Sequence, residues 1–279
     1  MRWLNFGCGR QFSDSAEWEN IDFISPCAKV KHVDLCHMWP YKDNTFDFAY
    51  SSHVLEHFSP DEALFVLKEA NRVLKPGGIL RTVVPDLEKS AREYIRTLDA
   101  NTGTAFEELQ HEWVVIEMID QMVRETNGGQ MATFMEMAKE KPALYAYVHG
   151  RIGQMVGAQI KSQITMQKLV RRLTQTWGQA VSTLLPPAMR KAALCASLDR
   201  HKWMYDRRSL SRIMSHAGFV SFTTRTCGDS EMPGFVTCGL DVLPSGSPYK
   251  GTTAIFCEAQ KINDPNGFGL RSEVRGLCK

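Results

Sequence analysis

The stretch LKEANRVLKPGGIL, residues 67–80, decides the fold expected for this chain. Its first half completes an apolar pattern with helical spacing, and this pattern predicts a helix over residues 59–74. The sequence Ser59-Pro60-Asp61-Glu62 is a capping box with proline at the first helical position, so it marks the start of the helix. Lys75–Gly78 ends the helix, because proline cannot continue a helix and glycine permits a turn. The apolar run Ile79–Val84 then predicts a buried strand.

Four short strand patterns precede this helix, and each ends in residues suited to binding a ligand. Strands that alternate with crossover segments predict a parallel sheet, in which ligands bind at the carboxyl ends of the strands. The four patterns cover Trp3–Phe6, Trp18–Asp22, Val30–Asp34 and Phe46–Tyr50, and the last is followed by Ser51 and Ser52.

Beyond the fifth strand the sequence pattern changes from strand-like to helical. From about residue 87 to 198 the strand signal disappears, and segments such as Trp113–Val123 show helical apolar spacing. The sheet pattern resumes with a helix over Ser209–Ala217 and strands over Phe219–Thr224 and Thr252–Gln260. We therefore expect an α/β fold: a Rossmann-like, doubly wound, mostly parallel seven-stranded sheet with a large helical insertion after strand five.

This pattern divides the chain into three parts. Residues 1–88 and 200–261 are expected to form the sheet domain, and residues 89–199 a helical insertion or lid. Residues 262–279 carry little apolar content, so we expect a flexible C-terminal tail.

Composition narrows the class of protein. The chain has 279 residues and a net charge of +2, which gives no global signal for a polyanionic partner. Eight cysteines are scattered without a Cys-x-x-Cys pair, which argues against a zinc ribbon or a redox dithiol. We see neither a signal peptide at the N-terminus nor an apolar run near the roughly 20 residues of a membrane span. These features favour a cytoplasmic protein with reduced thiols.

The strand ends carry the chemical signal. Gly7-Cys8-Gly9 follows the first strand, where glycines let a backbone approach a ligand closely. Asp22 ends the second strand, where a carboxylate can accept hydrogen bonds from ribose hydroxyls. Asp34-Leu35 ends the third strand, in a place suited to the edge of an adenine.

Taken together, these motifs resemble the class I S-adenosylmethionine-dependent methyltransferases, and most of all the type 11 methyltransferase domains. The resemblance covers roughly residues 1–90 and 200–261 and leaves the helical insertion outside. It is carried by LNFGCG (4–9), ENID (19–22), VDL (33–35), DNTFDFAYSSHVLEHF (43–58), EANRVLKPGGILRTVVPDL (69–87), HKWMYDRRSLSRIMSHAGF (201–219) and AIFCEAQK (254–261).

The resemblance implies S-adenosyl-L-methionine as the cofactor and assigns residues to its parts. Phe6, Gly7, Cys8 and Gly9 would flank its methionine portion, Asp22 would hold the ribose, and Asp34 and Leu35 would contact the adenine. Ser51 and Ser52 would lie beside the sulfonium and the amino-acid moiety.

One departure from dinucleotide-binding proteins stands out. Asp22 comes 13 residues after Gly9, against roughly 20 in dinucleotide fingerprints. Arg10–Glu17 is therefore expected to form a loop or a single turn, which argues against a nicotinamide-dependent dehydrogenase.

The stretch SSHVLEHF, residues 51–58, contains His53-x-x-Glu56-His57, which spells an inverted zinc-peptidase signature. That site needs one helix through both histidines, whereas the predicted helix starts only at Ser59. In a methyltransferase this stretch would face the transferred methyl. A histidine there suits proton removal from a hydroxyl acceptor. The catalytic candidates are His53, His57, His201 and Asp86; for Asp86, orientation of an acceptor and capping of the next helix both remain open.

A metal site is a further hypothesis. Some quinone-pathway and small-RNA 2′-O-methyltransferases carry Glu-x-x-Glu-His with a downstream histidine and bind a divalent metal. This chain resembles that arrangement with His53, Glu56, His57 and His201, and a histidine in the first place would favour a softer ion than Mg²⁺. Bracing of the loop or acid–base use of the same side chains remains the alternative.

The expected insertion is strongly basic in its second half. Residues 141–198 contain no Asp or Glu, so they suit an acidic, lipid-linked or carrier-linked acceptor or an anionic membrane surface. A solvated basic helix face is the alternative. We expect no nucleic-acid partner, because no aromatic platform is interleaved with the charges, and the sequence gives no oligomeric state. The basic residues are Lys141, Arg151, Lys161, Lys168, Arg171, Arg172, Arg190 and Lys191.

Three functional hypotheses follow. The first is a methyltransferase directed at an oxygen of a small-molecule, sugar or lipid-linked acceptor. The second is a catalytically inactive binding protein with the methyltransferase fold. The third is a metal-dependent hydrolase that uses His53-x-x-Glu56-His57. Acceptor choice belongs to the insertion, where no motif identifies it.

Overall fold

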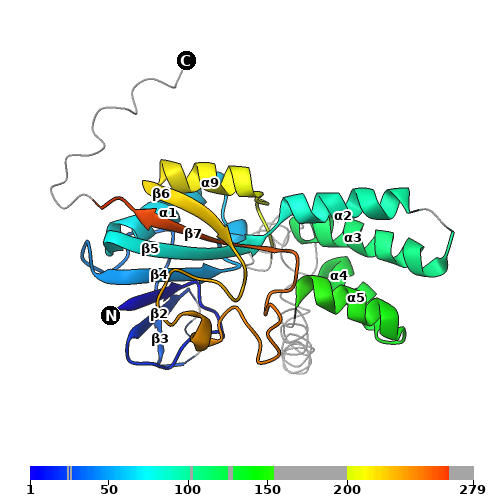
Figure 1. The fold of residues 1–279 in the computed structure, drawn as a ribbon, viewed down its shortest axis with the longest axis horizontal. Coiled ribbons are helices and arrows are strands. Elements are labelled where there is room, and N and C mark those ends of the chain that lie inside the picture. The colour runs from blue at the N-terminus through cyan, green and yellow to red at the C-terminus, as the bar shows by residue number, and fades with distance from the viewer. Residues whose placement is uncertain (24, 26, 101–102, 125–127, 154–199, 264–279) are drawn as a thin grey trace, which may run out of the picture.

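The computed structural model describes residues 1–23, 25, 27–100, 103–124, 128–153 and 200–263. Its centre is a seven-stranded sheet in the order β3-β2-β1-β4-β5-β7-β6 (Figure 1). Strand β7 runs antiparallel to both of its neighbours, and the pairs among β1 to β5 are parallel. The expected mostly parallel, doubly wound sheet is confirmed. The strands are β1 (Trp3–Phe6), β2 (Trp18–Asp22), β3 (Val30–His32), β4 (Phe46–Ser52), β5 (Leu74–Pro85), β6 (Phe219–Arg225) and β7 (Ala254–Lys261).

Two groups of helices accompany the sheet. Figure 1 shows α1 and α9 along the sheet, whereas α2 to α5 stand beyond the end where β5 leads into α2. None of the described helices is both long and apolar enough to cross a membrane. The helices are η1 (Leu55–His57), α1 (Pro60–Val73), α2 (Leu87–Asp99), α3 (Ala105–Val123), α4 (Gly129–Ala138), α5 (Pro142–Ile152), α9 (Arg207–His216) and η2 (Val236–Cys238).

Local sequence signals account for most helix boundaries. Ser59 accepts a hydrogen bond from the Glu62 backbone N–H, and the Glu62 side chain accepts one from the Ser59 backbone, so the predicted capping box forms. Helix α9 starts at Arg207, two residues before the predicted Ser209, because Asp206 caps it with bonds from the backbone N–H groups of Arg208 and Ser209. Between β1 and β2 the chain forms no helix, as expected from the short spacing.

Two strand predictions need correction. The Lys75–Gly78 turn is part of strand β5, where it bulges out between the paired positions Phe46–Leu74 and Phe48–Ile79. Gly77 permits this bulge with a φ of 78°. Strand β3 ends at His32, two residues before the predicted Asp34.

Alternation along the strands builds two cores on opposite faces of the sheet. One face packs α1 and α9 against residues such as Leu4, Leu80 and Ile255. The other face carries the rings of Trp3, Trp18, Tyr50 and Phe256, and Phe235 of the covering segment packs against them. In the described chain this second face is covered by residues 226–250, which are irregular apart from η2, rather than by an α-helix.

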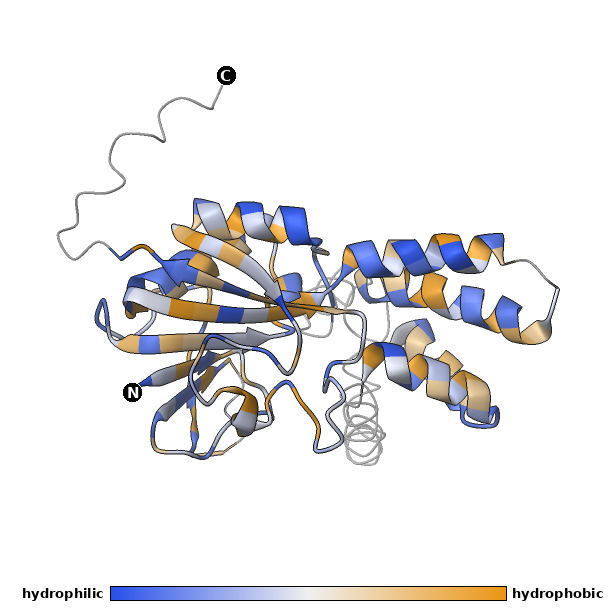
Figure 2. Ribbon diagram, viewed as in Figure 1, coloured by the Kyte–Doolittle hydropathy of each residue, from blue (hydrophilic) through white to orange (hydrophobic). Residues whose placement is uncertain are grey.

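Helices α2 to α5 form a separate apolar cluster around Trp113. Figure 2 shows hydrophobic colour along β5, β7 and α5, whereas α2 and α9 alternate hydrophobic and hydrophilic bands, as amphipathic helices do. Arg151, counted above among the basic surface residues, is buried here and pairs with Glu117 at 2.7 Å. Other parts of the predicted basic surface and tail lie outside the described residues: Lys161, Lys168, Arg171, Arg172, Arg190, Lys191 and 264–279.

The helical cluster joins the sheet through a backbone seam. The N–H groups of Thr252 and Thr253 donate to the carbonyls of Gly150 and Arg151 at the end of α5. Gly153 and Gly251 face each other so closely that a Cβ on either would collide with the opposite backbone. The seam fixes where the segment before β7 lies.

Arg81 on β5 holds the irregular segment to the second face. Its fully buried guanidinium donates to Asp241 at 2.6 Å, to Glu258 at 2.9 Å and to the carbonyls of Thr226 and Asp229 at 2.9 and 2.8 Å. It also lies 4.9 Å from the centre of the Phe235 ring. Every polar group of this network therefore has a charged partner inside the core.

We expect Arg81→Met to lower the free energy of unfolding by about 3–5 kcal/mol, because it removes the arginine that pairs with the buried Asp241 and one of the two arginines beside Glu258. Urea unfolding followed by circular dichroism measures the loss. Arg92→Met is the matched control, because Arg92 is exposed and pairs only along the surface of α2, so its removal should leave the midpoint unchanged. Equal midpoints for all three proteins would contradict the role given to Arg81.

Candidate functional site

The site lies where the direction of the strand order reverses, between β1 and β4. In open α/β sheets, ligands bind at the carboxyl ends of strands at this switch point. The backbone after β1 meets the backbone after β4 here: Gly7 has a φ of 65°, and a Cβ on it would lie 2.5 Å from a methyl of Val54. Only glycine fits, so the two strand ends can close on each other.

Gly9 and Asp22 form an open cradle beside this contact. The Gly9 N–H donates to the Asp22 carboxylate at 2.8 Å, which joins the ends of β1 and β2. Gly9 has a φ of 54°, and a Cβ on it would meet nothing within 4 Å, so the backbone here faces open space. A backbone turn with free space and a neighbouring carboxylate can accommodate a ribose-bearing ligand.

Four of the other cofactor residues expected from the sequence are buried in the protein interior. Phe6 is fully buried and its ring packs 5.1 Å from that of Trp39. Burial raises the pKa of the Cys8 thiol to about 12, so the thiol stays protonated and is no nucleophile. Leu35 is buried in the main core, and Ser51 is buried with its hydroxyl bonded to that of Thr82.

Asp34 and Ser52 lie nearer to the surface. Asp34 accepts a hydrogen bond from the Cys36 N–H at 3.0 Å and lies 3.0 Å from the His37 ring, so in this structure it caps its own loop. Ser52 is the last residue of β4, directly before His53.

Beyond Ser52 the chain turns sharply into η1. His53 has a φ of 55°, which is rare for a residue with a side chain, and η1 is a single three-residue turn. The two histidines of His53-x-x-Glu56-His57 therefore do not share a helix, and the zinc-peptidase arrangement predicted by the spelling is absent. The hydrolase hypothesis loses its structural basis.

The segment with His201 docks onto η1. The Glu56 carbonyl accepts hydrogen bonds from the N–H groups of Lys202 and Trp203, and the His201 N–H donates to Gln121 of α3. The His57 Nδ1 lies 3.1 Å from the Arg200 carbonyl. A carbonyl only accepts, so the His57 Nδ1 carries a proton in this contact.

This docking gathers three potential metal ligands. Glu56, His57 and His201 offer ligand atoms that all lie within 4.8 Å of one another. The His57 and His201 rings meet edge to face at 5.0 Å. His53 is outside this group, and its Nδ1 lies 3.3 Å from a Glu56 oxygen. The structure thus brings together three of the four predicted ligands and places the fourth beside them.

Several buried polar atoms at this spot have no hydrogen-bond partner among the described residues: the His53 Nε2, both Glu56 oxygens and the Tyr205 hydroxyl. Native proteins leave few such atoms, because an unsatisfied buried group costs about 1–3 kcal/mol. Their concentration at one strand end is the pattern of a site completed by a ligand.

Burial also sets the charge of the cluster. It raises the pKa of Glu56 to about 8, although the charge of Lys250 opposes this, and it lowers the pKa of Lys250 to about 7. Burial lowers the pKa of both His53 and His201 well below the usual range. Both imidazoles are therefore neutral near pH 7, the form that accepts protons and binds metals.

Asp86, the remaining catalytic candidate, caps helix α2. Its carboxylate accepts hydrogen bonds from the N–H groups of Glu88 and Lys89. Its backbone also forms a bridge to Tyr205, so it holds that residue beside the cluster.

Two residues of the cluster were not predicted. Tyr205 lies inside the matched stretch HKWMYD, where its spacing to His201 was the available signal. Lys250 belongs to the irregular segment before β7, and no local pattern separates it from a surface lysine.

The comparisons with known proteins agree with this geometry. Residues 10–82 match the family model described as a methyltransferase domain. The chain is 54% identical over 43 residues to a probable methyltransferase, ltbC, of Aspergillus luteorubrus, which covers 15% of either chain. It is 37% identical over 81 residues to the sterol 4-C-methyltransferase strm-1 of Caenorhabditis elegans, which covers 27% of this chain and 23% of that one. The matches thus span less than a quarter of each relative.

One of the solved structures that the chain matches is described as an S-adenosylmethionine-dependent methyltransferase, possibly a histamine N-methyltransferase, of Thermotoga maritima. It is 15% identical with a TM-score of 0.40, and the overlap covers 93% of this chain and 82% of that chain.

The sheet order and the glycine turn after β1 define an α/β domain of the doubly wound class. Within this domain, residues 10–82 match the family model described as a methyltransferase domain.

The raised pKa of Glu56 predicts a pH-dependent stability. The folded chain holds this proton up to about pH 8, whereas the unfolded chain releases it near 4.5, so stability falls as pH rises between these values. Lys250 contributes the opposite slope above its folded pKa of about 7, and His53 and His201, whose pKa values burial lowers, contribute it below about pH 6.5. These contributions are present in both wild type and Glu56→Gln, so they cancel when the two proteins are compared.

Between pH 5 and 7 we therefore expect wild type to lose up to about 1.4 kcal/mol of unfolding free energy per pH unit relative to Glu56→Gln. Urea unfolding with EDTA across this range measures the difference. The exposed Glu112→Gln is the control and should run parallel to wild type. Parallel curves for Glu56→Gln and wild type would show that Glu56 ionises normally in the folded protein.

Proposed function

We propose that this protein transfers a methyl group from S-adenosylmethionine to an oxygen of a small-molecule, sugar or lipid-linked acceptor. The observation that supports it is the pairing of two features at the switch point: the Gly7–Gly9 cradle with Asp22, and the cluster of unsatisfied buried groups after β4. The cofactor brings an already activated methyl group, so the protein mainly has to align donor and acceptor.

The residues of the cradle would do the binding. The backbone at Gly9 faces open space where the cofactor's methionine portion would lie. The Asp22 carboxylate, which the Gly9 N–H holds at the end of β2, would accept hydrogen bonds from the ribose hydroxyls. Asp34 would reach the adenine by leaving its loop contacts with Cys36 and His37.

Oxygen as the acceptor atom fits the chemistry of the cluster. A hydroxyl must lose its proton during transfer, and a neutral imidazole of His53 or His201 can take it. The cluster is closed on its far side by α3, through the bonds of the His201 segment to Gln121 and Met122. The helices would therefore exclude water and select the acceptor.

We place the protein in the cytoplasm, with the basic residues 161–191 as a contact for an anionic membrane.

Isothermal titration with S-adenosylhomocysteine tests the cradle. We expect micromolar binding by wild type and about 10- to 100-fold weaker binding by Asp22→Asn, which loses a charge-assisted hydrogen bond. Asp47→Asn is the matched control, because Asp47 pairs with Lys75 away from the cradle. Wild-type protein that binds no S-adenosylhomocysteine would rule the proposal out.

Turnover separates an enzyme from an inactive binding protein of the same fold. Cell extracts incubated with methyl-labelled cofactor should yield a methylated product with wild type. Binding without any labelled product would favour the inactive alternative.

We further propose that Glu56, His57 and His201 hold a divalent metal next to the acceptor. The donor set fits: one carboxylate with unsatisfied oxygens and two imidazoles, which is a set suited to Fe²⁺, Mn²⁺, Co²⁺ or Zn²⁺. Such an ion would acidify a hydroxyl bound to it.

Cobalt titration of chelator-treated protein, followed by visible absorption, tests this metal site. We expect one equivalent to bind to wild type and His57→Ala to bind at least about tenfold more weakly. His111→Ala is the control, because His111 bonds to Thr97 in the helical cluster. Binding that is equal in all three proteins, or absent in wild type, would refute the site.

A further inference from the structure

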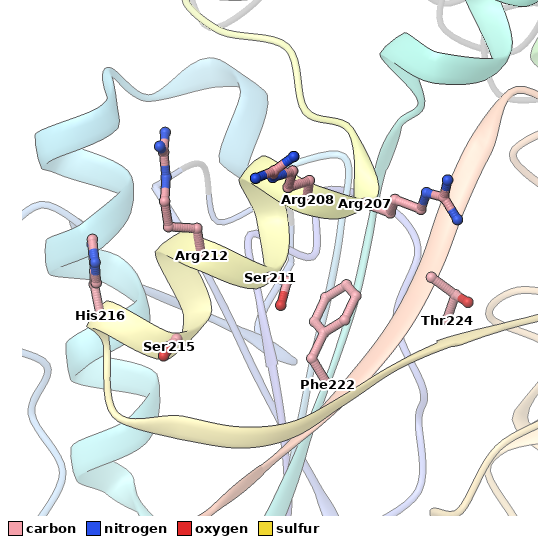
Figure 3. A pocket seen from close by; sticks show the side chains of 8 residues that line it. All are labelled: Arg207, Arg208, Ser211, Arg212, Ser215, His216, Phe222 and Thr224. Carbon is pink, nitrogen blue, oxygen red and sulfur yellow. The ribbon is translucent and has the colours of Figure 1, made fainter.

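A second site lies outside the methyltransferase cluster, in an open groove between α9 and β6. The groove has a volume of about 710 Å³, within the range of small-molecule sites. It is lined by three arginines, a histidine, three hydroxyl side chains and one phenylalanine, with no carboxylate among them (Figure 3). This composition selects for an anion that carries an apolar part.

A bulge in the edge strand β6 builds the floor of the groove. Pairing with β7 shifts between Val220 and Thr223, and Ser221 takes a φ of 56°. A bulge inserts one extra residue and re-aims the side chains that follow it. Phe222 and Thr224 are therefore both on the side of α9, and Figure 3 shows the Phe222 ring directed toward Ser211 and Arg208.

Helix α9 supplies the charge. Arg208 and Arg212 are one helical step of four residues apart, so they share a face with about 6 Å between them along the axis. Within the described chain neither guanidinium forms an ion pair, whereas the neighbouring Arg207 pairs with Glu88 at 2.9 Å. Asp206 is the acidic residue that precedes α9, and its carboxylate accepts hydrogen bonds from the backbone N–H groups of Arg208 and Ser209.

Unpaired guanidinium groups have a defined preference. Their planar forks match the oxygens of phosphate, which offers three acceptors and up to two charges. Ser211, Ser215 and Thr224 add hydroxyl donors around the same space. Phe222 offers a ring face to a planar or apolar body.

We propose that the α9–β6 groove binds a phosphorylated small molecule, with its phosphoryl group on Arg208 and Arg212 and its body on Phe222. The site is separate from the proposed methyl transfer and stands or falls without it. The phosphoryl group can belong to a free metabolite or to the end of a larger molecule, and both present the same chemistry.

Isothermal titration with 1-naphthyl phosphate at fixed ionic strength tests the groove. We expect a submillimolar Kd, at least about tenfold tighter than that of inorganic phosphate or 1-naphthol, because each of these lacks one half of the ligand. Arg208→Ala and Arg212→Ala should each weaken binding by about 10- to 100-fold. Arg208→Lys keeps the charge without the fork and should fall between.

Arg96→Ala, an exposed arginine on α2, is the matched control and should bind like wild type. Both groove arginines are exposed on the surface of α9, so the variants should keep the thermal midpoint of wild type. Unchanged binding in the groove variants would overturn the site. A single-stranded oligonucleotide that binds while 1-naphthyl phosphate does not would overturn the small-molecule assignment and make the groove a polymer contact.

Discussion

The buried guanidinium of Arg81 is the interaction on which the rest of the structure depends. A doubly wound sheet needs cover on both faces, and here one face is covered by an irregular segment that cannot satisfy its own backbone groups. Arg81 takes up two of that segment's carbonyls and two carboxylates, one from the segment and one from β7. An apolar residue in its place would pack against Phe235 but donate no hydrogen bond to the two carbonyls or to Asp241 and Glu258.

The same network leads from the core to the site. Asp241 binds Arg81 and the Tyr50 hydroxyl with its carboxylate, and its carbonyl accepts from the Tyr249 N–H. The next residue is Lys250, whose charge acts on Glu56 in the cluster after β4. The buried charges that hold the fold are therefore connected to those at the site. The Arg81–Asp241 pair helps to position Lys250, because Asp241 also binds the residue before it.

The features predicted correctly from the sequence are those that a few neighbouring residues determine. The Ser59 capping box, the strands and the mostly parallel sheet all follow from patterns of a few residues. The predicted strand limits were wrong at Lys75–Gly78 and at Asp34. Turn residues fit either a bulge or a loop, and pairing with the neighbouring strand decides between the two. The gathering of Glu56, His57 and His201 was expected, because a family resemblance spans their separation of more than 140 residues. The sequence did not predict the role of Lys250 or the groove on α9. The burial of Lys250 and the bulge in β6 arise from tertiary packing, and no local sequence pattern marks them.

The seam between Gly153 and Gly251 has a consequence for how such a molecule can diversify. The two halves of the chain meet there through main-chain atoms, with no side chain taking part at the closest point. Contacts between main-chain atoms do not depend on the side chains of the flanking helices, so most substitutions there leave these contacts intact. Exposed residues of α3 to α5 can therefore change one by one without moving the segment that carries Lys250, so the position of this lysine is insulated from changes on the helical surface.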